Sequence, residues 1–94
     1  MLTFPFCIVR VRTGRDSFPV SPSAGYVAAF SNPEKAARYM FKRGDVEWRT
    51  TLVSRPTLAE NIYVLKLLGF DGLAIDPANG SPGELVEFEK LPAM

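Results

Sequence analysis

The sequence contains no histidine in its 94 residues. Histidine is the commonest general base and metal ligand near neutral pH, and it is the usual partner of a serine or cysteine nucleophile. Cysteine is almost as scarce, because Cys7 stands alone and no internal disulfide can form. A single cysteine favours a cytosolic compartment. Cys7 lies in an apolar, strand-like stretch, so we expect a buried and unreactive thiol.

Several motifs and segments that would assign a function are also missing. The chain has no CxxC, HExxH, GxGxxG or Walker-type glycine loop. No apolar run approaches the roughly 20 residues that span a bilayer, and no cation precedes the first apolar residues as in a signal peptide. The carboxylate candidates, Asp71 and Asp76, fall near opposite ends of one predicted strand, too far apart to act as a pair. We therefore expect no catalytic residue, cofactor, metal ion or membrane association.

The composition is that of an ordinary globular domain. Hydrophobic residues make up 47% of the chain and charged residues 22%, and the length suits a single domain over residues 1–94. The formal net charge is only +1, so overall electrostatics predict no partner. Most cations precede residue 56 and most anions follow it. This asymmetry could support a basic patch or a head-to-tail contact, or it could vanish once the folded chain mixes its surfaces.

The clearest local signal lies between Tyr26 and Gly44. Residues 26–30 are apolar and predict a buried strand. Asn32 is a good N-cap and Pro33 suits the first helical position, so a helix should begin there. Gly44 follows two cations and marks the end of this helix. The spacing predicts a buried helix face made of Pro33, Ala36, Ala37, Met40 and Phe41.

Apolar and alternating stretches place further strands at residues 6–12, 46–53, 72–75 and 84–90, while residues 13–25 have the composition of a loop. With a second helix over residues 58–68, the order becomes β-β-α-β-α-β-β. This order predicts an α/β (α+β) fold, a mixed five-stranded sheet packed with two helices. The strand–helix–strand segments should be crossovers, right-handed if their strands are parallel neighbours. We expect Trp48 to lie on the helix-covered face rather than to stack on nucleic acid.

The second helix is predicted to begin with a capping box formed by Thr57 and Glu60. Its inner face should consist of Leu58, Ile62, Leu65 and Leu68. The outer face is unusual, because three apolar residues lie there beside Glu60: Tyr63, Val64 and Leu67. Either the chain buries this helix on two sides or a partner covers it. We expect a homo-oligomer in which these three residues form the contact.

Two other functions are open at this point. Six cations could contact nucleic acid or another polyanion, or they could simply form solvated surface: Arg10, Arg12, Arg15, Lys35, Arg38 and Lys42. Alternatively, a small ligand could bind in a pocket between residues 13–25 and the strand ends near Asp76.

Two short segments resemble a known family. Residues 27–36, VAAFSNPEKA, resemble the F-[TS]-x-P-E-x-A segment in the N-terminal domain of the enhanced serine sensitivity protein B (SseB-like) family. Residues 72–77, GLAIDP, resemble a later strand end of that family, with a glycine, an apolar pair, an aspartate or asparagine and a proline. The resemblance implies an α/β domain with a regulatory or interaction role, and it supplies no catalytic residue. The leading hypothesis is therefore a small non-catalytic protein-interaction or regulatory module that forms homo-oligomers.

Overall fold

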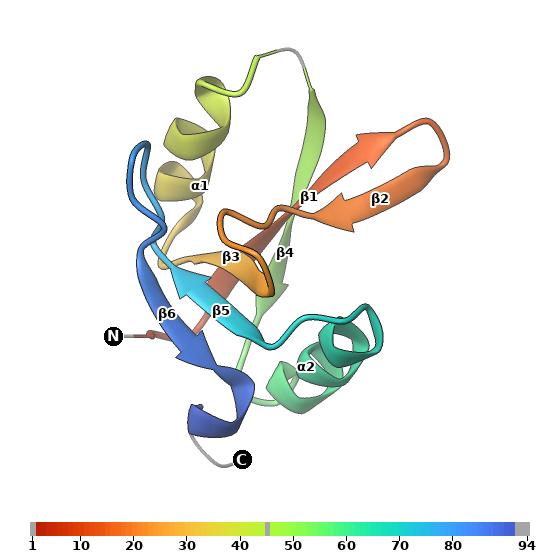
Figure 1. The fold of residues 1–94 in the computed structure, drawn as a ribbon, viewed down its shortest axis with the longest axis vertical. Helices are drawn as coiled ribbons and strands as arrows, with labels where there is room; N and C mark the ends of the chain where they lie inside the picture. The colour runs from red at the N-terminus through yellow and green to blue at the C-terminus, as the bar shows by residue number, and fades with distance from the viewer. Residues whose placement is uncertain (1, 45, 92–94) are drawn as a thin grey trace.

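The computed structural model describes residues 2–44 and 46–91. Their elements follow in the order β1 (Phe6–Thr13), β2 (Asp16–Pro19), β3 (Tyr26–Phe30), α1 (Pro33–Phe41), β4 (Glu47–Val53), α2 (Leu58–Leu67), β5 (Gly72–Ile75), β6 (Glu84–Glu87) and the short 3-10 helix η1 (Phe88–Lys90). All of these strands join one mixed sheet, and the two helices lie apart from each other around it (Figure 1). The predicted α+β fold, a mixed sheet packed with two helices, is confirmed.

β1 organises the sheet because it pairs with three other strands. β4 runs antiparallel along one side of β1, opposite residues 6–12. On the other side, β3 pairs with Cys7 and Ile8, and β2 pairs with residues 10–13. β5 adds parallel to β3, and β6 adds antiparallel to β5. The strand order is therefore β4, β1, β3, β5, β6, with β2 beside the second half of β1.

The sheet departs from the prediction in three places. Residues 16–19 form β2, which folds back on β1 as a hairpin where a loop was expected. The crossover strands are parallel but are not neighbours, because β1 lies between β3 and β4 and pairs with both. The last strand ends at Glu87 rather than at residue 90, since residues 88–90 turn into η1 and bury Phe88.

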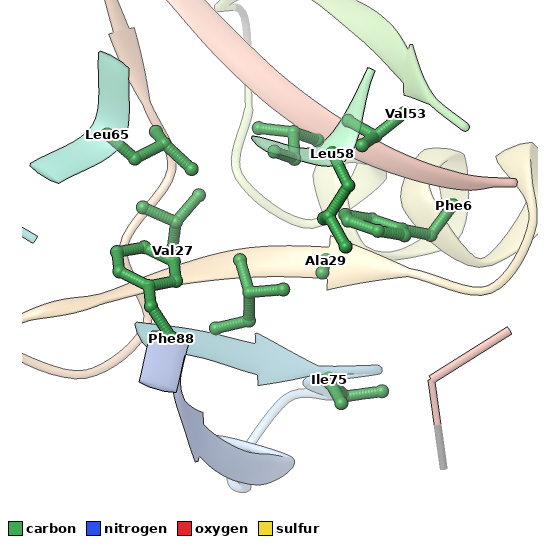
Figure 2. Packing of buried hydrophobic residues seen from close by; sticks show 10 residues of the cluster. Phe6, Val27, Ala29, Val53, Leu58, Leu65, Ile75 and Phe88 are labelled. Carbon is green, nitrogen blue, oxygen red and sulfur yellow. The ribbon is translucent and has the colours of Figure 1, made fainter. Parts of the chain in front are cut away.

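The two faces of the sheet carry separate apolar clusters, because alternate residues of β1 and β3 point to opposite faces. The α2-side cluster contains Phe6, Ile8, Val27, Ala29, Val53, Leu58, Leu65, Leu73, Ile75 and Phe88, which converge from strands, α2 and η1 (Figure 2). The α1-side cluster contains Cys7, Val9, Val20, Ala28, Phe30, Ala36, Tyr39 and Met40. Each helix therefore covers a different face of the sheet.

The start of α1 follows the prediction. The Asn32 Oδ1 atom accepts a hydrogen bond from the Lys35 N–H at 2.9 Å, which satisfies one of the free amides of the first turn. Pro33 is the first helical residue, where its missing N–H costs nothing. The helix ends at Phe41, and Gly44 follows with a φ of 82°, in the left-handed region that favours glycine.

The buried face of α1 differs from the predicted one. Ala36 and Met40 are buried as expected, but Pro33, Ala37 and Phe41 are exposed, so their predicted burial is wrong. Tyr39 is buried in their place. Its ring packs on Phe30, with the ring centroids 5.4 Å apart, while its hydroxyl accepts a hydrogen bond from Arg43. A tyrosine can satisfy both surroundings because its ring is apolar and its end is polar.

α2 begins at the predicted residue, but without the predicted side-chain cap. Thr57 is the N-cap residue, as predicted. The capping box is wrong, however, because the Thr57 side chain makes no cap hydrogen bond. Its Oγ1 atom instead accepts the Ser54 N–H at 3.0 Å, which stabilises the turn between β4 and α2. The hydroxyl serves the turn before the helix, so it is not available to the helix itself.

β4 is the most exposed of the longer strands. Val53 is its only buried residue, and Trp48 is half-buried against the α1-side cluster, as predicted for the helix-covered face. Leu52 lies on the same face as Trp48 and is 61% exposed. α1 therefore does not extend over the outer strand of the sheet.

Candidate functional sites

The carboxyl ends of the parallel strands β3 and β5 meet beside the start of α1. Ser31 directly follows β3, and Asp76 directly follows β5. The Asp76 carboxylate accepts hydrogen bonds from the Ser31 N–H at 2.8 Å and from the Ser31 hydroxyl, and it pairs with the Lys35 Nζ atom at 3.3 Å. Asp76 has a φ of 49°, which is uncommon for a residue other than glycine. These contacts hold a strained backbone in place.

The same contacts set the charge of Asp76. Partial burial opposes ionisation and by itself raises the pKa of Asp76, but hydrogen bonds from the Ser31 side chain and backbone and from Lys35 outweigh burial and hold the pKa below its usual range. The group is therefore a carboxylate at neutral pH. Because Ser31 and Lys35 already occupy both of its oxygens, Asp76 acts as an anchor between β3, β5 and α1 rather than as a proton acceptor.

A hollow of about 320 Å³ opens beside this anchor, between α1 and the turn that follows β5. We call it the basic groove, and its lining consists of Lys35, Arg38, Tyr39, Lys42, Asp76, Pro77, Ala78 and Asn79. Arg38 and Lys42 have no ion-pair partner among residues 2–44 and 46–91. Ligands of open α/β sheets commonly bind at the carboxyl ends of the strands, where this groove lies. Its charge suits an anionic group.

A second hollow of about 450 Å³ continues from the basic groove. The two share Tyr39, Ala78 and Asn79 as lining residues. The second hollow also brings Pro22 and Ser23 against the turn formed by residues 78–82. Residues 13–25 thus border a hollow near the strand ends, although Asp76 itself lines only the basic groove.

The structure does not bring the six predicted polyanion contacts onto one surface. Lys35, Arg38 and Lys42 line the basic groove on the α1 side of the sheet. Arg10 and Arg12 alternate along β1 with residues of the α1-side cluster, so their side chains lie on the opposite face of the sheet. Arg15 is exposed between β1 and β2. Three of the cations therefore lie together, and the other three lie elsewhere.

Arg49, which was not among the predicted contacts, lies on the same face of the sheet as Arg10 and Arg12. β4 places Arg49 directly opposite Arg10, and it places Glu47 opposite Arg12, with which Glu47 forms an ion pair at 3.8 Å. These residues line a hollow of about 330 Å³. Alternation within residues 46–53 places Arg49 on the mixed face of its strand. The pairing of that strand with β1, which brings the two arginines together, cannot be read from local sequence.

The outer face of α2 is apolar, as expected. Tyr63 is 64% exposed, Val64 40% and Leu67 69%. Leu68 is 54% exposed, so its predicted place on the inner face is wrong. It follows the last residue of α2, where the chain turns away towards β5. We call these four residues the α2 patch; they form two neighbouring pairs with a spacing of four residues, which lie side by side on a helix.

Other reactive features are few in the part of the chain that the structure describes. Cys7 is buried, and this burial raises the pKa of its thiol, which disfavours the nucleophilic thiolate. Among the described residues, no three histidine, cysteine, aspartate or glutamate side chains gather as they would around a metal ion. No helix within residues 2–44 and 46–91 is long and apolar enough to cross a membrane.

No family model, no curated protein and no solved structure matches the chain. The resemblance to the SseB-like family therefore stays a prediction.

Proposed function

We propose that the protein is a small non-catalytic interaction module that self-associates through the α2 patch. The observation that carries this proposal is the exposure of four neighbouring apolar side chains on α2 and its C-cap, while the opposite side of the helix already packs on the sheet. Single exposed apolar residues are common on protein surfaces, but a contiguous group of this kind marks an interaction site. The presence of Tyr63 in the patch fits this role, because aromatic residues are enriched at interfaces.

A second copy of the chain is a suitable partner for this patch. If two α2 helices pack antiparallel around a two-fold axis at Tyr63, each Tyr63 faces its counterpart. Glu60 of one copy then lies opposite Lys66 of the other, because both are three residues from the centre. Both charges are exposed in the single chain. The contact would thus have an apolar centre and a charge-complementary rim, which is the usual arrangement of interfaces.

Size-exclusion chromatography with light scattering tests the proposal. The wild type should have a mass above that of one chain, and the double variant Tyr63→Glu/Leu67→Glu should have a lower mass at the same concentration, because its carboxylates would be buried without partners. A matched control is Ala37→Glu/Phe41→Glu, which places two glutamates with the same spacing on the exposed side of α1. This control should keep the wild-type mass. A monomeric wild type would refute the proposal.

The basic groove favours a second candidate function, the binding of a small anionic ligand. It combines a hollow at the strand ends with two cations, Arg38 and Lys42, that have no ion-pair partner within residues 2–44 and 46–91. A thermal-shift titration with phosphate, pyrophosphate and nucleotides tests this function, because a ligand that binds only the folded chain raises its melting temperature. Arg38→Gln/Lys42→Gln should abolish the shift, while Lys66→Gln/Lys90→Gln removes the same charge elsewhere and should retain it. No shift with any of these anions would exclude this candidate.

A further inference from the structure

β4 leaves one long edge of the sheet unprotected. It has seven residues, and within the described parts of the chain it pairs only with β1. The opposite edge of the sheet is β6, which has four residues and a glutamate at each end. Short and charged edges are the usual protection against unwanted strand pairing. β4 is longer, contains no proline or glycine, and is rich in the aromatic and β-branched residues that favour strands.

The hydrogen bonds of β1 show which backbone groups of β4 are free. The Val9 carbonyl accepts the Val20 N–H at 2.9 Å, so the backbone groups of Val9 point away from β4. Val9 lies directly opposite Thr50. In an antiparallel ladder, two residues that face each other either both bond across or both point away. The N–H and C=O groups of Thr50 therefore point to the free edge, and alternation gives Trp48 and Leu52 the same direction.

The side chains of these three residues form a self-complementary row. All three lie on the α1 side of the sheet, because β4 places them opposite Val11, Val9 and Cys7. Trp48 and Leu52 are the apolar ends, and Thr50 is the centre. If a second β4 lies antiparallel with Thr50 opposite Thr50, then Trp48 of each copy lies opposite Leu52 of the other. That register covers Leu52, which is 61% exposed in the single chain.

Charge favours the same register. With Thr50 at the centre, Arg49 lies opposite Thr51 and Glu47 lies opposite Val53, so no like charges face each other. A centre at Arg49 would instead put two arginines directly opposite, which destabilises a strand pair. A centre at Thr51 would put Leu52 opposite Thr50, so that Trp48 of one copy would no longer face Leu52 of the other.

We propose that β4 pairs with β4 of a second copy of the chain, antiparallel and centred on Thr50, so that two sheets become one continuous sheet. The backbone groups of Trp48, Thr50 and Leu52 then bond across the two-fold axis. This contact goes beyond the proposed function, because it joins backbones at the sheet edge rather than side chains of the α2 patch. The two contacts use different elements, so either can exist without the other.

Cysteine cross-linking tests the register. In the proposed pairing, the two Thr50 Cα atoms are about 5.5 Å apart, which is within the range for a disulfide. Thr50→Cys should therefore form a covalent dimer on mild oxidation. Thr51→Cys is the matched control, since Thr51 is the same residue type and is also exposed, but it lies opposite Arg49 and its two copies are beyond the reach of about 7 Å. Cys7 is buried, so the wild type should stay uncross-linked. Equal cross-linking of both variants, or of neither, would overturn the proposed register.

Thr50→Pro tests the contact itself by light scattering. Its lost N–H faces the free edge rather than β1, and proline is tolerated at such edge positions. Thr50→Val keeps the N–H and should keep the wild-type mass. If β4 forms the contact, Thr50→Pro lowers the mass while circular dichroism still shows a folded chain, and Tyr63→Glu/Leu67→Glu leaves β4-linked dimers. If Tyr63→Glu/Leu67→Glu is already monomeric, the β4 contact is refuted and the α2 contact stands. If Thr50→Pro alone is monomeric, the α2 contact is refuted instead.

Discussion

Asp76 combines a strained backbone with a partly buried charge. Its positive φ would be costly in isolation, and its partial burial opposes ionisation. Both costs are offset by contacts with Ser31 and Lys35, which come from the end of β3 and the first turn of α1. The residue thus connects three elements that are distant in sequence. It also forms one wall of the basic groove.

Asp76→Asn should reveal this contribution through its pH dependence. Asparagine tolerates a positive φ and keeps the side-chain shape, but it removes the charge. At pH 7 the variant should be less stable by about 1.5–3 kcal/mol, the usual range for hydrogen bonds to a charged group. Because the folded-state pKa of Asp76 is lowered, the stabilisation is complete above the ordinary aspartate pKa of about 4 and is lost as the pH falls through the folded-state value. Urea unfolding of both proteins between pH 3 and pH 7 measures the difference, and a gap that does not change with pH would contradict this account.

Gly83 and Gly80 illustrate two different reasons for a glycine in a turn. Both have a positive φ, 78° at Gly83 and 84° at Gly80. A Cβ atom at Gly83 would lie 2.3 Å from the Ile75 carbonyl oxygen, whereas at Gly80 nothing lies within 4 Å. Gly80→Ala should therefore cost about 1–2 kcal/mol for backbone strain alone. Gly83→Ala should cost about 1–3 kcal/mol more, because the backbone around it must move. Urea midpoints of the two variants check this, and equal midpoints would show that the close approach is relieved without cost.

The starts of the two helices make a contrasting pair of elements. Asn32 caps α1 with its side chain, whereas the Thr57 side chain does not cap α2. Asn32→Ala should therefore lower the free energy of unfolding by about 1 kcal/mol, and Asn32→Asp should retain it, because aspartate offers the same acceptor. Glu60→Ala should change it by less than about 0.5 kcal/mol, because no capping box is formed. Thermal or urea unfolding measures all three variants, and a larger loss for Glu60→Ala than for Asn32→Ala would reverse the assignment.

The sequence was informative where one element's own residues decide the outcome. Asn32 and Pro33 fix the start of α1, and the apolar run at residues 26–30 becomes the buried β3. The apolar outer face of α2 was also predicted, because it depends only on helical spacing. The prediction was wrong where a neighbour decides. Thr57 bonds to Ser54 instead of capping α2, and Tyr39 replaces Phe41 in the core because Phe30 offers its ring a contact.

Long-range pairing accounts for the rest of what the sequence could not show. Residues 16–19 carry a proline and a phenylalanine without clear alternation, and they become β2 only because β1 extends far enough to pair with them. The position of β4 beside β1 is equally invisible in local patterns. The basic groove also depends on long-range pairing. Asp76 and Lys35 are separated by 41 positions, and they meet only when β3 and β5 pair. Helical spacing predicted the three cations of α1, but it did not predict that the turn after β5 forms the opposite wall of the basic groove.

At the scale of the whole molecule, the sheet divides charge as well as apolar residues. One face carries α1 with Lys35, Arg38 and Lys42, and the other carries Arg10 and Arg12. The excess of cations in the first half of the sequence is therefore spread over opposite sides of the fold. This arrangement weakens the hypothesis of one extended polyanion surface. It leaves Lys35, Arg38 and Lys42 together at the basic groove, which is the proposed site for a small anion.

The divided charge gives a quantitative prediction for nucleic acid. Each neutralised phosphate contributes about −0.9 to the slope of log K against log salt concentration, so a single face with three cations allows a slope no steeper than about −3. Six cations on one surface would give about −5. Fluorescence anisotropy of a labelled duplex should therefore show only weak binding at 20 mM NaCl and none near 150 mM. Two double variants, Arg10→Gln/Arg12→Gln and Arg38→Gln/Lys42→Gln, remove the same charge from opposite faces. Their losses of affinity for the duplex should not add when the two variants are combined. Tight binding at 150 mM NaCl with a slope near −5, lost equally in both variants, would show that the duplex wraps around both faces and would restore the polyanion function.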